Sequence, residues 1–337
     1  MEYSVAVAGA TGAVGQEMLK VLEQREFPLK SLKLLASERS KGKVLTFRGE
    51  SCPVEVLDSG SFRDIDIALF SAGSSISREY REAVVSSGAV MIDNSSAFRM
   101  DDEVPLVVPE VNPDDAAEHR GVIANPNCST IIMVVPLFPL YTQIGIRRVH
   151  CCTYQAASGA GARVMQELKE ETEAVLKGEE YTNTIIPFQY AFNLFPHNSE
   201  MGEDGYCEEE RKMILETRKI FHNDNVLVNA TCVRVPVLRA HSEAVNIEFE
   251  RKTSVEEIYD ILKQAPGVEI REDRDKNRWA MPADISGEYP VAVGRVRKDV
   301  SQDNTFDLWV VGDQLLKGAA LNAIQIAELV AEKGISR

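Results

Sequence analysis

A cysteine at the edge of a long apolar run is the first residue here that could do chemistry. Cys128 follows Asn-Pro-Asn in the stretch ANPNCST and precedes TIIMVVPLF. This boundary is typical of the first turn of a helix, where free backbone N–H groups favour a thiolate and could hold an oxyanion. Cys128 is therefore a candidate nucleophile. The alternative is a small buried thiol, the ordinary state of a cysteine.

A thiol nucleophile needs a polar partner, and His241 has the most suggestive surroundings of the five histidines. It falls on a turn between two β-like runs in CVRVPVLRAHSEAV. Alternation through VRVPV sets Arg234 among apolar neighbours, and a buried arginine is costly unless it meets an anion. The pair indicates a site for an anionic ligand, with a structural histidine as the alternative.

Two further segments carry charges that fit such a site. Arg99 follows the strand-like run AVMIDNSS, and open parallel sheets bind ligands at the carboxyl ends of their strands. In EEERKM, Glu209 and Lys212 are three residues apart and so share a helix face. Glu209 could receive an amine and Lys212 an anion. A surface ion pair is the alternative for these two residues.

Three glycines follow the first strand-like run. AVAGATGAVGQE places Gly9, Gly12 and Gly15 between that run and a helical pattern. Glycines there allow a tight turn and a close approach of the backbone to a phosphate at a helix N-terminus. This predicts a dinucleotide site; an ordinary strand–turn–helix corner is the alternative.

The end of the second strand-like run indicates which dinucleotide. In LLASERSKGK, Arg39, Ser40 and Lys41 could hold a 2′-phosphate, which favours NADP. Glu38 is the residue that would favour NAD instead. A solvated loop is the alternative for the two cations.

The elements that must position these residues form two groups. The first third alternates strand-like and helix-like runs, which predicts βαβ units and a parallel sheet. Strands are expected at 3–9, 31–37, 64–73 and 89–96, and helices at 13–26 and 77–88.

The middle of the chain has longer β-like runs with helices set apart, which predicts a mixed sheet in an α+β domain near 128–313. Strands are expected at 147–161, 226–237, 242–250, 289–299 and 305–313, and helices at 162–177, 208–221 and 254–265. A last helix is expected over 314–334, with Leu316, Ala320, Ala323, Ile324 and Ala327 on one face.

Composition narrows the class of protein. The 337 residues suggest two domains, and a net charge of −15 disfavours nonspecific binding to nucleic acid or anionic membranes. We find no secretory signal and no apolar run long enough to span a bilayer, so we expect a cytosolic location. Six cysteines without disulfide or zinc spacing predict reduced thiols and no metal site.

Several separated motifs together resemble one known family. GATGAVG, NPNCST, TYQAASGAG, EERK, CVRVPVLRAHSEAV and DQLLKGAALNAIQIAE occur in this order and resemble the aspartate-β-semialdehyde dehydrogenases, in the branch of Gram-positive bacteria. The resemblance implies an α/β fold with a Rossmann-like NADP-binding domain, 1–127 plus 314–337, to which the C-terminal helix returns. It also implies an α+β catalytic and dimerisation domain with a mixed sheet, 128–313, and a homodimer.

The resemblance implies a role for each matching residue. Cys128 would be the acyl-enzyme nucleophile, Gln155 would orient the intermediate and His241 would be the acid–base residue. Arg234 would clamp the α-carboxylate of the substrate, and Glu209 would receive its amino group.

The remaining implied contacts concern phosphate and cofactor. Arg99 and Lys212 would bind phosphate, and Asn127 would line the same pocket. The implied NADP contacts are Gly9, Thr11, Gly12, Ala13, Val14, Gly15, Arg39, Ser40, Ser158, Gly159 and Gln314. Gln314 stands where the family often has Asn.

The implied reaction is NADPH-dependent reductive dephosphorylation of L-aspartyl-4-phosphate to L-aspartate 4-semialdehyde through a cysteine thioester. It belongs to the biosynthesis of lysine by way of diaminopimelate, of threonine and of methionine. N-acetyl-glutamyl-phosphate reductase is the nearest alternative, and Glu209 as receptor of a free amine argues against it. A non-catalytic NADP-sensing protein would leave Cys128, Gln155, Arg234 and His241 unexplained as a set.

Overall fold

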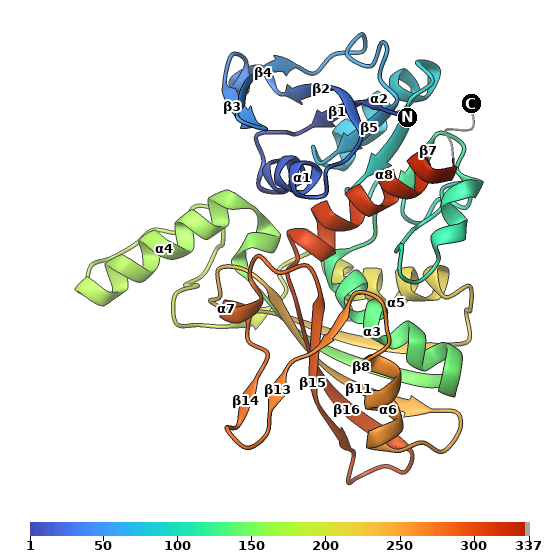
Figure 1. Ribbon diagram of the computed structural model, residues 1–337. Helices are drawn as coiled ribbons and strands as arrows, with labels where there is room; N and C mark the ends of the chain where they lie inside the picture. Colours follow the sequence, from blue (N-terminus) through green and yellow to red (C-terminus); the bar gives the residue numbers. More distant parts are fainter. Residues whose placement is uncertain (334–337) are drawn as a thin grey trace. The chain divides into compact units, whose positions relative to one another are not determined.

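The computed structural model describes residues 1–333, which form parts of two compact units (Figure 1). Unit 1 comprises Met1–Asn127 and the chain from Ala319 onward, and unit 2 comprises Cys128–Gly318. The chain re-enters unit 1 five residues later than expected, so Gln314 belongs to unit 2. Residues 334–337, with which the expected tail helix and first domain end, lie outside the described residues.

Unit 1 is built on a seven-stranded sheet in the order β3-β4-β2-β1-β5-β6-β7, parallel except for β3. The strands are β1 (Tyr3–Ala8), β2 (Leu29–Ala36), β3 (Val44–Phe47), β4 (Glu50–Val56), β5 (Ile67–Phe70), β6 (Val90–Asp93) and β7 (Val122–Ala124). The helices are α1 (Ala13–Gln24), α2 (Ser74–Ser86) and α8 (Leu321–Lys333). Every residue of β1, β5 and β6 is buried, as in a parallel sheet covered on both faces.

The C-terminal helix α8 packs within unit 1. The Tyr3 hydroxyl donates to the carbonyl oxygen of Ala331 at 2.8 Å, and Arg25 pairs with Glu328 at 2.6 Å. The alanine-rich face expected from the sequence is buried, but a single π-helical turn, Leu316–Ala320, precedes α8. The regular helix therefore begins at Leu321 and not at residue 314.

Unit 2 contains the mixed sheet, in the order β12-β15-β16-β11-β8-β10-β9, and a separate hairpin β13-β14. Its strands are β8 (Ile146–Gln155), β9 (Phe195–Pro196), β10 (Leu227–Arg234), β11 (His241–Phe249), β12 (Val268–Ile270), β13 (Glu272–Asp273), β14 (Arg278–Trp279), β15 (Val291–Lys298) and β16 (Thr305–Gly312). Its helices are α3 (Cys128–Ile144), α4 (Ala162–Lys177), α5 (Glu208–Ile220), α6 (Val255–Leu262) and α7 (Pro282–Ile285). The α/β fold class with a mixed second sheet is confirmed.

Helix α3 is the centre of the unit 2 core. It packs against strands β8, β11, β15 and β16, and residues 129–137 are all buried. An apolar helix buried on all sides is what its near-continuous hydrophobic run requires. Within residues 1–333, no helix is both long and apolar enough to cross a membrane.

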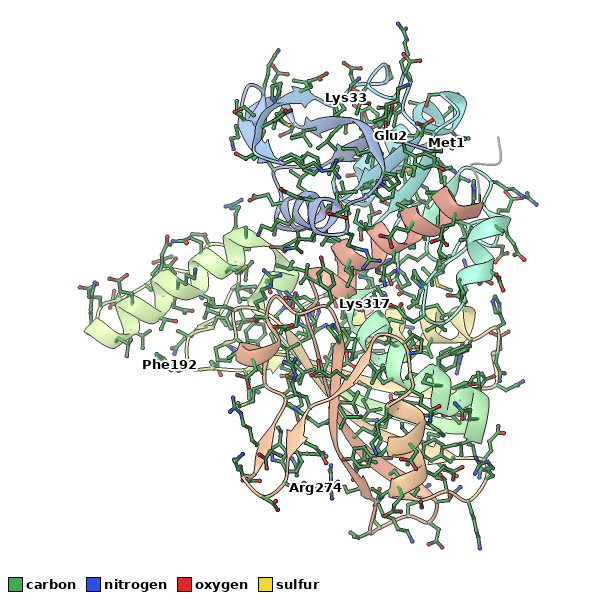
Figure 2. All side chains as sticks on the ribbon, in the orientation of Figure 1. Met1, Glu2, Lys33, Phe192, Arg274 and Lys317 are labelled. Atoms are coloured by element: carbon green, nitrogen blue, oxygen red, sulfur yellow. The ribbon has the colours of Figure 1, made fainter. Side chains whose placement is uncertain are left out.

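Helix α4 and the segment that follows it form an arm of unit 2 (Figure 2). Glu167 of α4 accepts three backbone N–H bonds, from residues 184–186, and Glu171 accepts two more, from Tyr190 and Ala191. These bonds fix an arm whose side chains include the exposed Phe192 (64%) and Leu194 (61%).

Candidate active site

Cys128 is the first residue of α3, as the sequence predicts. Its thiol is half-buried, whereas Ser129 and the eight residues after it are buried. Gly318, from the turn before α8, lies so close that a Cβ there would be 2.8 Å from the Cβ of Cys128. The nucleophile candidate therefore sits at the partly open end of a rigid helix, against a position that has no room for a side chain.

Three of the predicted residues meet because of strand register. Strands β8 and β10 are parallel and end side by side, with Gln155 opposite Arg234. Strand β11 runs antiparallel to β8 and begins at the same edge with His241. All three side chains are at least nine-tenths buried.

His241 is fixed in one tautomer by the residue that follows β8. The backbone N–H of Ala156 donates to Nδ1 of His241 at 3.0 Å, so in the neutral ring the proton lies on Nε2. Nε2 is buried and has no partner among the described residues. A side chain at Gly159 would come within 3.0 Å of Nε2, so this glycine keeps the nitrogen uncovered.

The ring of His241 is neutral at ordinary pH. Burial, assisted by the positive charge of Arg234, lowers the pKa of His241 to about 3. A neutral ring protonated at Nε2 offers a hydrogen-bond donor to the site and not a lone pair.

The amide of Gln155 connects the start of α3 to α5. Its Nε2 donates to Ser129 Oγ at 2.6 Å and to Glu209 Oε1 at 3.0 Å. Its Oε1 is buried without a partner within residues 1–333. Gln155 therefore has one acceptor left for a ligand.

Within residues 1–333, Arg234 is a buried cation without an acidic partner. It is 5% exposed, and its guanidinium donates to the carbonyl oxygen of Ala156 at 3.2 Å and contacts Nε2 of His197 at 2.8 Å. Its Nε has no partner in the described part of the chain. A buried guanidinium with only neutral acceptors is suited to receiving an anion.

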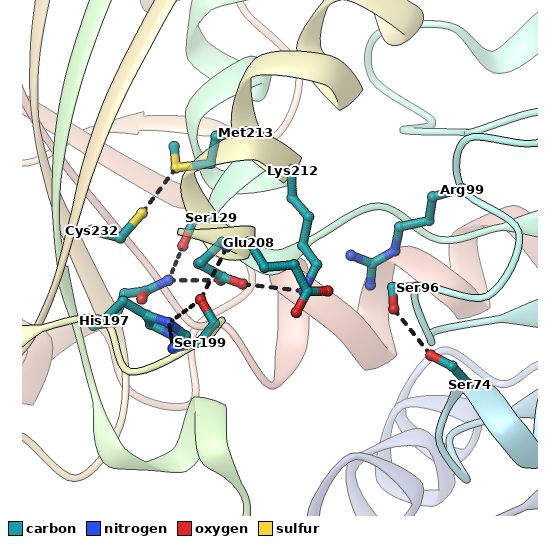
Figure 3. A network of polar contacts seen from close by, with 12 residues as sticks. Ser74, Ser96, Arg99, Ser129, His197, Ser199, Glu208, Lys212, Met213 and Cys232 are labelled. Atoms are coloured by element: carbon teal, nitrogen blue, oxygen red, sulfur yellow. Dashed lines mark hydrogen bonds and ion pairs between the residues drawn. The ribbon is translucent and has the colours of Figure 1, made fainter. Parts of the chain in front are cut away.

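Glu209 and Lys212 do not form an ordinary surface ion pair, because the two side chains differ in burial and in partners. Glu209 is 7% exposed, and Lys212 Nζ lies 3.6 Å from it but 2.9 Å from Glu208 (Figure 3). Glu209 is thus a buried carboxylate held by Gln155, and Lys212 is shared between two acidic groups.

The other predicted phosphate ligands belong to unit 1. Arg99 is buried, and its guanidinium donates to the carbonyl oxygens of Asn125 and Asn94, both at 2.9 Å. Asn127 is also buried.

The glycine turn of unit 1 has the predicted geometry. Gly9 has φ +87°, and a Cβ there or at Gly15 would come within 2.3 Å of a backbone oxygen. Helix α1 begins at Ala13 with no side-chain cap on its first N–H groups and no acidic residue in its first turn. The backbone can therefore approach a phosphate closely.

The end of β2 lies beside this turn. Ser40 Oγ is 3.3 Å from Thr11 Oγ1. Lys41 pairs with Glu38 at 3.1 Å and so neutralises the acidic residue that would favour NAD. Arg39 has no ion pair in the described residues. Val14, the remaining residue predicted here, lies in the first turn of α1.

Two residues of unit 2 that are predicted to contact the cofactor are hydrogen-bonded to each other. Gln314 accepts the backbone N–H of Ala240 at 2.8 Å, and its amide nitrogen donates to Ser158 Oγ. Its side chain links the segment after β8 to the residue that precedes His241. Ala240 itself has φ +69°, a strained conformation for a residue with a side chain.

Comparisons with known proteins show the family of the chain. A model of the semialdehyde dehydrogenase NAD binding domain matches residues 4–119, and one of the semialdehyde dehydrogenase dimerisation domain matches residues 137–317. An aspartate-semialdehyde dehydrogenase of Synechocystis sp. is 54% identical over 330 residues, which are 98% of each chain. The chain belongs to the aspartate-semialdehyde dehydrogenase family.

Solved structures of aspartate-semialdehyde dehydrogenases have the same fold. The enzyme II of Vibrio cholerae, complexed with ASA, has a TM-score of 0.94 at 44% identity and covers 98% of this chain and 99% of its own. That of Candida albicans, with NADP, has a TM-score of 0.77 at 25% identity and covers both chains fully.

The comparisons also decide between the alternatives. As a member of this family the chain is an oxidoreductase, and the relatives do not support an N-acetyl-glutamyl-phosphate reductase or a non-catalytic sensor. The narrower placement in a Gram-positive branch is wrong. The Bacillus subtilis enzyme is 50% identical over 96% of each chain, below the 54% of the cyanobacterial Synechocystis enzyme.

Proposed function

We propose that this chain reduces L-aspartyl-4-phosphate to L-aspartate 4-semialdehyde with NADPH, through a thioester on Cys128, in aspartate-family amino-acid biosynthesis. The observation that carries the proposal is a set of buried polar atoms at one sheet edge of unit 2 that have no partner in the described part of the chain: Gln155 Oε1, Arg234 Nε and His241 Nε2. Such a set indicates a polar ligand with both donors and acceptors.

The head group of the substrate fits the charges of unit 2. Arg234 would bind the α-carboxylate, because no acidic side chain within residues 1–333 neutralises it. Glu209, with the free Oε1 of Gln155 nearby, would receive the α-ammonium group. An acetylated amine would carry no positive charge for the buried carboxylate of Glu209, which argues for a free amino acid.

The chemistry begins at Cys128. Its thiolate attacks the acyl carbon, the bond from that carbon to the phosphate oxygen breaks, and the phosphate leaves with the electron pair. His241 donates from Nε2 to the oxyanion that forms, as an electrophile and not as the base. Arg99, Lys212 and Asn127 would bind the departing phosphate.

Reduction of the thioester needs a cofactor, since no side chain can supply hydride. The glycine turn, the uncapped start of α1 and the Arg39–Ser40 segment fit a dinucleotide phosphate, and NADPH supplies hydride when bound. Ser158, Gly159 and Gln314 would complete its site. After reduction, the thiolate of Cys128 is released as the aldehyde forms, and Nε2 of His241 holds the hydrogen bond to the oxygen until then.

The assembly we propose is a homodimer formed by unit 2, with unit 1 as the nucleotide domain and the cytosol as its location. The match to a dimerisation domain supports it. So do the exposed apolar side chains of the arm, Phe188, Phe192 and Leu194, and the open face of the sheet at Tyr154 and Leu227.

One assay tests the proposed reaction. NADPH formation is followed with L-aspartate semialdehyde, phosphate and NADP, before and after alkylation with iodoacetamide. We expect turnover that requires phosphate, is lost on alkylation and is much weaker with NAD. Turnover that survives alkylation of Cys128 would contradict the thioester route, and equal use of NAD would contradict the cofactor preference.

A further inference from the structure

Two residues outside the predicted site connect its two charged ends. His197 and Ser199 follow the short strand β9, in the stretch FPHNS (Figure 3). His197 Nε2 lies 2.8 Å from Nη2 of Arg234. Ser199 Oγ lies 3.0 Å from Nδ1 of His197 and accepts the backbone N–H of Glu209 at 3.2 Å.

Arg234 determines which atoms donate and which accept in this series of hydrogen bonds. A guanidinium only donates, so Nε2 of His197 must be the acceptor, and the proton of the neutral ring lies on Nδ1. The backbone N–H of Ser199 also points at Nδ1 from 3.2 Å and competes for this position, but the contact of Nε2 with the cationic Arg234 is shorter, so we assign the proton to Nδ1, which donates to Ser199 Oγ. Burial lowers the pKa of His197 to about 4, which keeps the ring neutral.

A neutral acceptor at position 197 affects the charge of Arg234 differently from an acidic one. A carboxylate at this position would hold Arg234 equally well but would neutralise it. The imidazole holds the guanidinium and leaves its full charge for a ligand.

The same series of hydrogen bonds also positions Glu209. Ser199 binds its backbone N–H at the first turn of α5, while Gln155 binds its carboxylate at 3.0 Å. One short segment therefore sets both the arginine and the glutamate, which come from different elements.

We propose that His197, acting with Ser199, is a positioning residue that sets Arg234 and Glu209 for the carboxylate and ammonium groups of one α-amino-acid head group. This inference rests on the proposed function. It assigns to His197 the discrimination between an amino-acid semialdehyde and one that lacks the amine, such as succinate semialdehyde.

Three substitutions separate this role from simple packing. His197→Gln keeps a neutral acceptor at the position of Nε2, His197→Phe keeps the ring without an acceptor, and His197→Glu adds a charge. His119→Gln, in unit 1, is the control for removing a histidine.

The kinetic readout is the KM for L-aspartate semialdehyde. We expect His197→Phe and His197→Glu to raise it about tenfold or more, the size expected for a lost bond to a charged group. The KM for phosphate and for NADP should stay within about threefold, and the preference over succinate semialdehyde should fall. His197→Gln and the control should resemble the parent. Equal KM values for the Phe and Gln variants, or a loss of kcat alone, would overturn the proposal.

A binding measurement is independent of turnover. L-2-aminobutyrate carries the same head group without a reactive aldehyde, and its affinity is measured by calorimetry in the parent and each variant. Weaker binding in the Phe variant than in the Gln variant supports the role of His197 even if the parent fails to oxidise the semialdehyde. Equal affinity in the two variants would overturn it, whatever the outcome of the activity assay.

Discussion

His241 accepts, at Nδ1, the backbone N–H of Ala156 from 3.0 Å away. An amide N–H cannot give up its proton, so the neutral imidazole must carry its own proton on Nε2. The histidine of this site is therefore a donor held in place by the residue after β8, and the proposed catalytic role of His241 follows from that.

The first prediction concerns this donor. We expect His241→Ala to lower kcat by about 10²–10³, the usual effect of removing a group that stabilises an oxyanion. His241→Gln, whose amide can still donate, should retain at least about tenfold more activity than His241→Ala. Steady-state kinetics of both variants provide the measurement, and a Gln variant no better than the Ala variant would point to a base instead.

The second prediction concerns the close packing of Cys128. Gly318→Ala would bring a Cβ within 2.8 Å of the Cβ of Cys128, so the thiol must move. A displaced nucleophile should lower kcat by roughly 10- to 100-fold. The matched control is Gly60→Ala, where the nearest atom is an exposed side-chain oxygen of Asp58 at 3.3 Å. Equal activity of the two variants would mean that the fit around Cys128 does not matter.

The third prediction concerns the stability of the fold at acid pH. The pKa values of His197 and His241 are lowered to about 4 and about 3, so between these values and about 6.5 the unfolded chain binds more protons than the native one. Stability from these rings is present at neutral pH and is lost as the pH falls through this range. For His197 alone the loss between pH 7 and pH 5 should be roughly 2 kcal/mol.

Urea unfolding of the parent and of His197→Gln at the two pH values measures this loss. The difference between pH 7 and pH 5 should be smaller in the variant by that amount. Burial raises the pKa of Glu243 and acts in the opposite direction, but equally in both proteins, so it cancels. An identical pH dependence would show that His197 is not buried as a neutral ring.

The fourth prediction concerns the residue before the histidine. Ala240 is fully buried at φ +69°, where its backbone N–H is bound by Gln314. Ala240→Gly should remove the strain and, after the entropy of glycine is counted, raise the unfolding free energy by roughly 0.5–1 kcal/mol. Chemical denaturation measures it. A destabilised glycine variant would show that the alanine methyl packs better than the strain costs.

The sequence predicts the individual residues of this site better than their arrangement in space. Cys128 stands at a visible boundary, and alternation identifies Arg234 as an unusual strand arginine. The pairing of Gln155 with Arg234, and the start of β11 beside them, depend on long-range register that no local pattern specifies.

The missed elements have local causes. Strand β4 contains Pro53, a residue that argues against a strand, and β3 and β7 are only four and three residues long. His197 follows a two-residue strand in a segment without periodicity, so nothing near it in sequence indicates that it contacts Arg234.

The central claim is that the sulfur of Cys128 carries the acyl group. The direct measurement incubates the enzyme with L-aspartate semialdehyde and NADP without phosphate, quenches with acid and maps the peptides by mass spectrometry. We predict a hydroxylamine-sensitive aspartyl adduct on the peptide with Cys128, present in the control Cys152→Ala and absent, together with all turnover, in a folded Cys128→Ala variant. An adduct on another residue, or turnover in the Cys128→Ala variant, would contradict the account.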